Sequence, residues 1–213
     1  MTGGNNAYTE EEKRVLFHTS KINNNEFVPF MSIDLTEKFQ FAIPFTDKDG
    51  FLALSPKQKK DFHRWVRPDD ICKDPCVLYR EPDYYSIKQT IVSDCSFVAS
   101  LAVSASYERR FGKKLVTAII YPRNKDKVPL YNPFGKYMVK LHLNGVARKV
   151  IIDDYLPLSR YGQLLCSYSS NKNEFWISLL EKAYMKVMGG YDFPGSNSVS
   201  ITCLTSYKNV PVV

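Results

Sequence analysis

The sequence predicts an α+β domain in which a bundle of helices packs against a small antiparallel sheet, and three patterns carry this prediction. Apolar residues recur at helical spacing through "CSFVASLAVSA" (95–105) and again through residues 173–190. Between them, residues 137–143 alternate apolar and polar side chains, which is typical of a strand with one buried face. A chain of 213 residues with 44% hydrophobic content is long enough to bury such a core without disulfides or metal.

The N-terminal part is expected to hold short helices separated by irregular chain. The segment "TEEE" (9–12) has the spacing of a capping box, so a first helix should begin there. A second helix is expected from Ser55 to about Trp65, with a proline in its first turn, and "RPDD" (67–70) should end it. Residues 71–88 are predicted to be a loop.

The rest of the chain is expected to alternate helices and strands. The expected elements are, in order, a helix from Cys95 to a Gly112 C-cap, a buried strand at 115–122, an antiparallel pair at 137–143 and 148–157 joined by Asn144-Gly145, and a helix at 173–190. Asn-Gly between two apolar runs is a strong hairpin signal, and glycine is the usual residue just after a helix. The last helix should bury one apolar face and stop at Gly189-Gly190.

The charge pattern argues against a nucleic-acid partner. The formal charge of +7 comes from 29 Lys and Arg against 22 Asp and Glu, and the basic residues are scattered. The densest cluster, "RRFGKK" (109–114), falls where a helix should end, and cations there complement the helix dipole. No apolar stretch reaches the roughly 18 residues that a membrane span needs, so no transmembrane segment is expected.

Cysteine usage points to a reducing compartment. Five cysteines at uneven spacing do not resemble a disulfide framework, and the polar N-terminus shows no signal peptide. We therefore expect an intracellular, cytoplasmic or nuclear location. Cys72 and Cys76 are spaced C-x3-C, but no second Cys/His pair accompanies them, so we interpret them as loop cysteines rather than zinc ligands.

Cys95 is the residue that most invites a catalytic interpretation. It should lie in the first turn of its helix, where unpaired N–H groups and the positive end of the dipole stabilise a thiolate. Gln89, six residues upstream, could bring its amide to the same oxyanion as the Cys95 backbone N–H. The residues alone leave two alternatives open, a nucleophile or a small buried core cysteine. The neighbouring carboxylates Asp153 and Asp154 are interpreted as turn residues rather than a hydrolase pair.

Four segments resemble one family in the same order. They are "WVRP" (65–68), "QTIVSDCSFVASL" (89–101), "VIIDDYLP" (150–157) and "NEFWISLLEKAYMKVMGGYDF" (173–193). They resemble motifs of the calpain family of papain-like cysteine peptidases, and "SDCSF" resembles its atypical PalB-like branch. The resemblance implies a papain-like calpain catalytic core, of which this chain holds the first, mainly helical subdomain. It also implies an intracellular endopeptidase that acts on protein substrates through an acyl-enzyme.

The resemblance assigns roles and boundaries. Cys95 is expected to be the nucleophile, and Gln89 is expected to contribute to the oxyanion hole. Residues 1–64 are expected to form an N-terminal extension with short helices, 65–198 the protease subdomain, and 199–213 a divergent tail.

The catalytic His and Asn of calpains belong to a second, β-rich subdomain, and we expect both to be absent from this chain. The one histidine after Cys95, His142, falls on the polar face of a strand, and His18 and His63 lie in expected N-terminal helices without a supporting motif. We therefore expect little or no peptidase activity from this chain alone and a complementary protease subdomain as a partner. The alternative is a catalytically silent truncated calpain that binds proteins or regulates the full enzyme.

Calcium is the one cofactor that the resemblance raises. Calpains hold an ion in this subdomain through the glutamate of Glu-Phe-Trp, matched here by Glu174, and an aspartate nine residues before the cysteine. That second position is Ser86, with Asp83 three residues away. Losing a carboxylate weakens a site for a hard cation, so we expect no tight calcium binding and no other cofactor.

Overall fold

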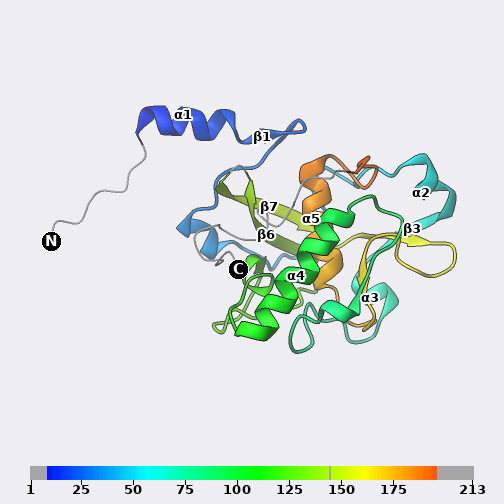
Figure 1. Cartoon of the computed structure of the whole chain (residues 1–213). Helices are drawn as coiled ribbons and strands as arrows, with labels where there is room; N and C mark the ends of the chain where they lie inside the picture. Colours follow the sequence, from blue (N-terminus) through cyan, green and yellow to red (C-terminus); the bar gives the residue numbers. More distant parts are fainter. Residues whose placement is uncertain (1–8, 144, 196–213) are drawn as a thin grey trace.

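The computed structural model describes residues 9–143 and 145–195, and its core is two helices over a small sheet (Figure 1). Helix α5 (Trp176–Met188) contacts both long strands of the sheet on one side and helix α4 (Cys95–Phe111) on the other. The sheet has the order β5-β6-β7, with β5 at Ile120–Tyr121, β6 at Lys136–Leu143 and β7 at Val146–Asp153. The α+β class expected from the sequence is confirmed.

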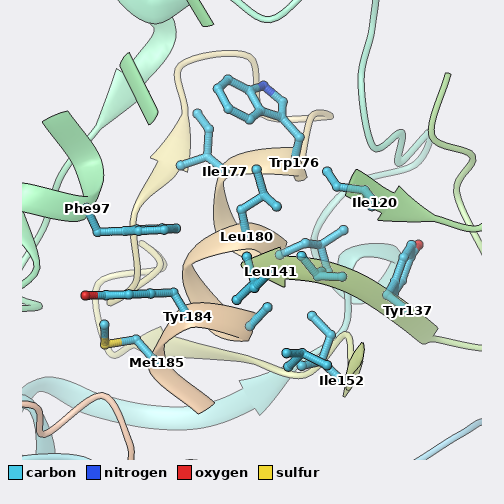
Figure 2. Close-up of a cluster of buried hydrophobic side chains, with 14 of the residues drawn as sticks. Phe97, Ile120, Tyr137, Leu141, Ile152, Trp176, Ile177, Leu180, Tyr184 and Met185 are labelled. Atoms are coloured by element: carbon cyan, nitrogen blue, oxygen red, sulfur yellow. The ribbon is translucent and has the colours of Figure 1, made fainter. Parts of the chain in front are cut away.

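Helix α5 is the centre of the core. Every residue from Trp176 to Val187 is buried, so the helix is covered on all sides and not only along the apolar face that the sequence indicates. Its charged members are buried too, and Lys182 and Lys186 form ion pairs with aspartates. Figure 2 shows the apolar side chains of this helix between Phe97 of α4 and Leu141 and Ile152 of the sheet. Gly189, with φ +104°, ends the helix as expected.

The predicted hairpin is present, but its second strand is shorter than expected. Strands β6 and β7 pair antiparallel from Lys136↔Asp153 to Leu143↔Val146. The strand predicted to run to 157 stops at Asp153 because the Asp153 and Asp154 side chains turn into buried ion pairs. Strand β8 (Leu156–Ser159) then starts separately and pairs with a different partner.

The partner of β8 is a strand that lies within the second predicted helix, so that prediction is partly wrong. Helix α2 covers only Pro56–Asp61, and Phe62–Val66 form strand β3, antiparallel to β8. The strand is rich in aromatic and β-branched side chains, and a partner far along the chain overrides the local helical pattern. "RPDD" does not end a helix but starts one, α3 (Pro68–Ile71), in which the Asp70 carboxylate accepts the Arg67 N–H at 2.7 Å.

The prediction of a strand at 115–122 is wrong for most of its length. Only Ile120–Tyr121 pair with β6, and Thr117–Ile119 form a 3-10 turn, η3. The Glu108 carboxylate at the end of α4 accepts the N–H groups of Leu115 and Thr117, so these groups are not available to a sheet. Gly112 is the C-cap of α4, as predicted.

The remaining elements are short. They are α1 (Glu10–His18), β1 (Lys21–Ile22), β2 (Asn25–Glu26), η1 (Ser32–Thr36), η2 (Tyr84–Ser86), β4 (Ile87–Lys88) and β9 (Tyr168–Ser169). The predicted capping box starts α1. The segment 71–88, predicted to be a loop, contains η2 and β4, and β4 pairs with β9. Helix α1 projects from the body in Figure 1 and buries none of its residues.

The N-terminal segment is tied to the sheet by Arg148 of β7. This side chain is fully buried and has no carboxylate partner among the described residues. It donates to the hydroxyls of Ser20 at 2.7 Å and Thr19 at 2.9 Å, and to the carbonyl of Phe27 at 3.2 Å. Within the described ranges, no helix is both long enough and apolar enough to cross a membrane. The expected tail, 199–213, lies outside the described residues.

Candidate active site

Cys95 is the first residue of α4, and its side chain is exposed. The helix starts on the Asp94 carbonyl, which accepts the N–H groups of Phe97 at 2.8 Å and Val98 at 3.0 Å. No described residue accepts the backbone N–H of Cys95, which is therefore available to a ligand. An exposed sulfur beside an unpaired N–H at a helix start excludes the alternative of a core cysteine.

The position of Cys95 is fixed by the residues that follow it. Phe97 is fully buried, and its ring stacks on that of Tyr184 in α5, as Figure 2 shows. Leu101 and Ala105 continue the buried face of α4, while Ala102, expected in the same stripe, is half-buried. The helix is thus anchored by one face, and its first residue stays at the surface.

Gln89 lies at the same helix start. Its side-chain Nε2 donates weakly to Asp94 Oδ1 at 3.4 Å and to the Val92 carbonyl at 3.5 Å, and the residue is exposed. The loop from Gln89 to Asp94 is held at its beginning, where Thr90 bonds the Leu165 carbonyl and β4 pairs with β9. The loop brings the Gln89 amide to the residue preceding Cys95.

A buried carboxyl pair supports this loop, and sequence reasoning missed it. Asp94 is 1% exposed, and its carboxyl lies against that of Glu181 of α5, which is 0% exposed. Both Glu181 oxygens accept the Ser167 N–H, at 3.0 and 2.9 Å. Burial raises the pKa of both carboxyls, and the proximity of Asp94 raises that of Glu181 further. No sequence signal marked this contact, because Glu181 lies off the apolar face expected for the 173–190 helix.

Gly195 completes the surroundings of the helix start. Its φ is +98°, and a Cβ there would lie 3.1 Å from the Ser93 carbonyl oxygen. The backbone of residue 195 therefore passes directly against the segment that precedes Cys95, which only glycine allows without strain. This approach joins the chain after α5 to the same site.

The histidines do not join this site. No hydrogen bond links Cys95 to a histidine in the described part of the chain. His142 is half-buried on β6, opposite Ala147, and is therefore less exposed than the sequence indicates. This burial lowers its pKa. His18 ends α1 as expected, but His63 lies in β3 and not in the predicted helix.

The other described cysteines differ from Cys95 in exposure. Cys72 and Cys76 are half-buried, and Cys166 is buried. Burial raises the pKa of all three thiols, which disfavours their thiolates. Cys95 is the exposed member of this set.

The residues proposed for calcium do not fit a cation site. Glu174 Oε1 accepts the Tyr79 N–H at 3.0 Å, and its Oε2 accepts the Ser169 hydroxyl at 2.7 Å. Ser86 donates its hydroxyl to the Asp83 carbonyl, and the Asp83 carboxylate faces Arg109 at 3.3 Å. Across the described residues, no group of three or more His, Cys, Asp or Glu side chains is placed to hold a metal ion.

The Asp153 and Asp154 carboxylates have structural partners. Asp153 pairs with Lys182 of α5 and accepts the Asp47 N–H, and Asp154 pairs with Arg67. Arg67 also stacks on the Tyr155 ring, 4.1 Å from its centroid. Both aspartates are 1% exposed, which agrees with the structural interpretation and leaves no room for a hydrolase pair.

Comparisons with known proteins point to one family. A family model described as "Calpain family cysteine protease" matches residues 43–203. Calpain-7 of Mus musculus is 66% identical over 201 residues, which are 94% of this chain and 25% of that protein, and calpain-7 of Homo sapiens gives the same figures. The calpain-like protease palB of Emericella nidulans is 35% identical over 205 residues, 89% of this chain and 24% of that protein. The chain thus spans about a quarter of the length of these relatives.

Proposed function

Because the chain belongs to the calpain family of cysteine proteases, we propose that it carries the nucleophile-bearing part of a calpain-type endopeptidase, with Cys95 as the nucleophile. The observation that carries the proposal is the exposed Cys95 sulfur at the first residue of α4, with the Gln89 amide held beside the same helix start. The proposed boundaries remain 65–198 for the protease subdomain, after an N-terminal extension.

The proposed chemistry is acyl transfer. The Cys95 thiolate attacks the carbonyl carbon of a peptide bond. The carbonyl π electrons move onto the oxygen, which gives a tetrahedral intermediate with an oxyanion. The Cys95 N–H and the Gln89 amide stabilise that oxyanion, and one such donor is typically worth about 10²–10³ in rate. Collapse expels the amine with a proton from an acid, and water then hydrolyses the thioester.

The acid is proposed to come from a second subdomain. No described histidine is hydrogen-bonded to Cys95, so this part needs a histidine and an orienting asparagine that it does not provide. We propose that the second subdomain, whether on the same polypeptide or a partner, closes over the start of α4. The protein substrate would lie between the two parts, and the proposed setting is the cytoplasm or nucleus.

A second candidate function follows from the same observation. Without a base, the exposed helix start would bind a peptide carbonyl without cleaving it, and the chain would act as a silent, protein-binding form of the enzyme. The two candidates differ in what Cys95 does chemically, and thiol reactivity separates them.

The test is competitive alkylation of the purified chain with substoichiometric iodoacetamide, followed by peptide mapping. A primed nucleophile predicts that Cys95 is labelled faster than the other four cysteines and that Cys95→Ala removes the fast phase. Cys72→Ala is the matched control and should leave that phase intact. Labelling that is uniform, or faster at another cysteine, would contradict the nucleophile assignment.

Turnover of casein by the same preparation tests the missing base. We expect no cleavage above the Cys95→Ala background. Cleavage that disappears in Cys95→Ala would show that the chain is complete as a peptidase and would reject the need for a second subdomain.

A further inference from the structure

We propose that Asp94 and Glu181 form a carboxyl pair joined by a single proton, and that this pair is the positioning element for the oxyanion donor Gln89. The inference rests on the proposed function and adds two residues to it. Neither residue touches the substrate in this proposal; both act through the Gln89 side chain.

The first argument is the direction of the Asp94 side chain. An aspartate at the N-cap normally accepts the N–H of the second or third helical residue. Asp94 occupies the N-cap of α4 but makes no such bond. Its carboxyl turns inward, to Gln89 through Oδ1 and to Glu181 of α5. The side chain therefore serves the loop and the neighbouring helix instead of the cap.

The second argument is a continuous set of contacts from the core to the site. The Ser167 N–H fixes the Glu181 carboxyl, the Glu181 carboxyl lies against that of Asp94, and Asp94 Oδ1 accepts from Gln89 Nε2. Ser167 is itself held, because its carbonyl accepts the Ser178 hydroxyl at 2.8 Å. Each member before Gln89 is 1% exposed or less, so the set is a rigid support ending in an exposed amide.

The third argument concerns charge. Asp94 Oδ2 is buried and receives no N–H or O–H from the described residues when both carboxyls are ionised. Two buried carboxylates in contact repel each other, and desolvation penalises each, so one of them retains its proton. That proton supplies the donor that Asp94 otherwise lacks.

The other titratable groups around the pair do not replace the proton. Cys166 and Tyr191 interact with Glu181, and burial raises the pKa of both, which keeps them neutral. Lys182 follows Glu181 in sequence but points to Asp153 and to the Tyr155 carbonyl. No cation among the described residues forms an ion pair with either carboxyl.

The consequence for Gln89 follows from its two amide hydrogens. One is directed to Asp94 Oδ1 and the nearby Val92 carbonyl, which sets the plane of the amide. The other remains for the oxyanion. Loss of the shared proton would place two negative charges between α5 and the 89–94 loop and would move the loop away.

The first experiment is infrared spectroscopy of the full chain in D2O at neutral pH. We expect a carboxylic-acid C=O band, which carboxylates do not give, and we expect Glu181→Gln to remove it. Glu108→Gln is the matched control, because Glu108 is a buried glutamate at the other end of α4, and it should leave the band in place. Absence of the band, or its survival in Glu181→Gln, would overturn the proposal without bearing on Cys95.

The second experiment separates positioning from general stability. A peptide aldehyde adds to the thiol and creates an oxyanion, whereas iodoacetamide forms a thioether, expels iodide and creates none. We expect Gln89→Ala and Glu181→Ala to weaken aldehyde binding by up to about 10²–10³-fold while iodoacetamide labelling of Cys95 stays near the wild-type rate. Glu181→Gln, whose neutral amide can still donate to Asp94, should retain binding.

The pH dependence supplies the last readout. Aldehyde binding by the wild type should fall at alkaline pH as the pair loses its proton, and Glu181→Gln should lack that decline. Equal aldehyde binding by wild type and Glu181→Ala would refute the positioning role. A wild type in which no reagent reacts selectively at Cys95 would instead refute the proposed function, so the two failures are distinguishable.

Discussion

The ring of Phe97 lies parallel to the ring of Tyr184, with centroids 4.2 Å apart and planes inclined by 2°. Phe97 is two residues after Cys95, and Tyr184 is three residues after Glu181. The stack therefore joins the helix that presents the sulfur to the helix that holds the carboxyl pair. It sets the relative position of α4 and α5 at the end where the candidate site lies.

Truncation of this stack should destabilise the whole domain. Phe97→Ala removes a fully buried ring, and large-to-small changes of this kind cost about 3–5 kcal/mol. Urea unfolding followed by circular dichroism measures the loss. Val103→Ala is the control, because Val103 is exposed on the same helix and its removal should change the unfolding free energy by less than about 0.5 kcal/mol. Equal effects of the two changes would show that the stack does not carry the α4–α5 contact.

Glu181→Gln should change how stability depends on pH. Burial raises the pKa of Glu181 in the folded chain above its unfolded value, near 4.3. The folded state then binds more protons than the unfolded state, so the wild type loses stability as pH rises from that value towards the folded pKa. The variant has no such proton to lose. Its unfolding free energy relative to the wild type should increase between about pH 5 and pH 8.

Urea titrations at several pH values measure this difference. Glu11→Gln, at an exposed position in α1, controls for the loss of one negative charge and should give a difference that is flat with pH. A flat difference for Glu181→Gln as well would show that its carboxyl is ionised in the folded chain.

Removal of Lys182, one of two buried lysines in α5, should destabilise the domain strongly. Lys182→Met leaves Asp153 buried without its cation, and breaking one side of a buried pair costs about 3–5 kcal/mol. Lys59→Met, on the exposed surface of α2, should be close to neutral. Thermal unfolding of the two variants side by side tests the prediction. A neutral Lys182→Met would mean that Asp153 is satisfied by backbone N–H groups alone.

Arg148→Met should release the N-terminal segment while leaving the core intact. Loss of even one hydrogen bond from a charged donor costs about 1.5–3 kcal/mol, so opening of this segment should become at least about 10–100-fold more frequent. Amide hydrogen exchange in residues 16–27 measures the change, and exchange in α5 should stay slow. Arg14→Met on the exposed side of α1 is the control. Unchanged exchange near Ser20 would show that other contacts hold the segment.

The sequence predicts the parts of this structure that depend on local pattern. Helices α4 and α5, the β6–β7 hairpin and the capping box of α1 follow from spacing, turn residues and caps within a few positions. The helix predicted over 55–65 was wrong in its second half. Phe62–Val66 pairs with a strand almost a hundred residues later, and no local signal indicates such a partner.

The candidate site divides in the same way. The place of Cys95 in the first turn of α4 and the return of Gln89 to the helix start follow from local pattern and the six-residue spacing, whereas the residues alone left open whether Cys95 is exposed or buried. The Asp94–Glu181 contact and the approach of Gly195 to Ser93 depend on how α5 and the following chain pack on α4. These contacts join residues far apart in sequence, so residue types alone could not pair them.

The contact between Asp94 and Glu181 also fixes when the site can form during biosynthesis. A chain made from its N-terminus releases α4 from the ribosome long before α5 has been translated. Until then Phe97 lacks the Tyr184 ring on which it stacks, and the Asp94 carboxyl lacks Glu181 as its partner. The sulfur at position 95 therefore acquires its native surroundings only late in translation. A nascent chain that stops before residue 176 should expose the apolar face of α4 to chaperones, with the Cys95 thiol not yet held in place.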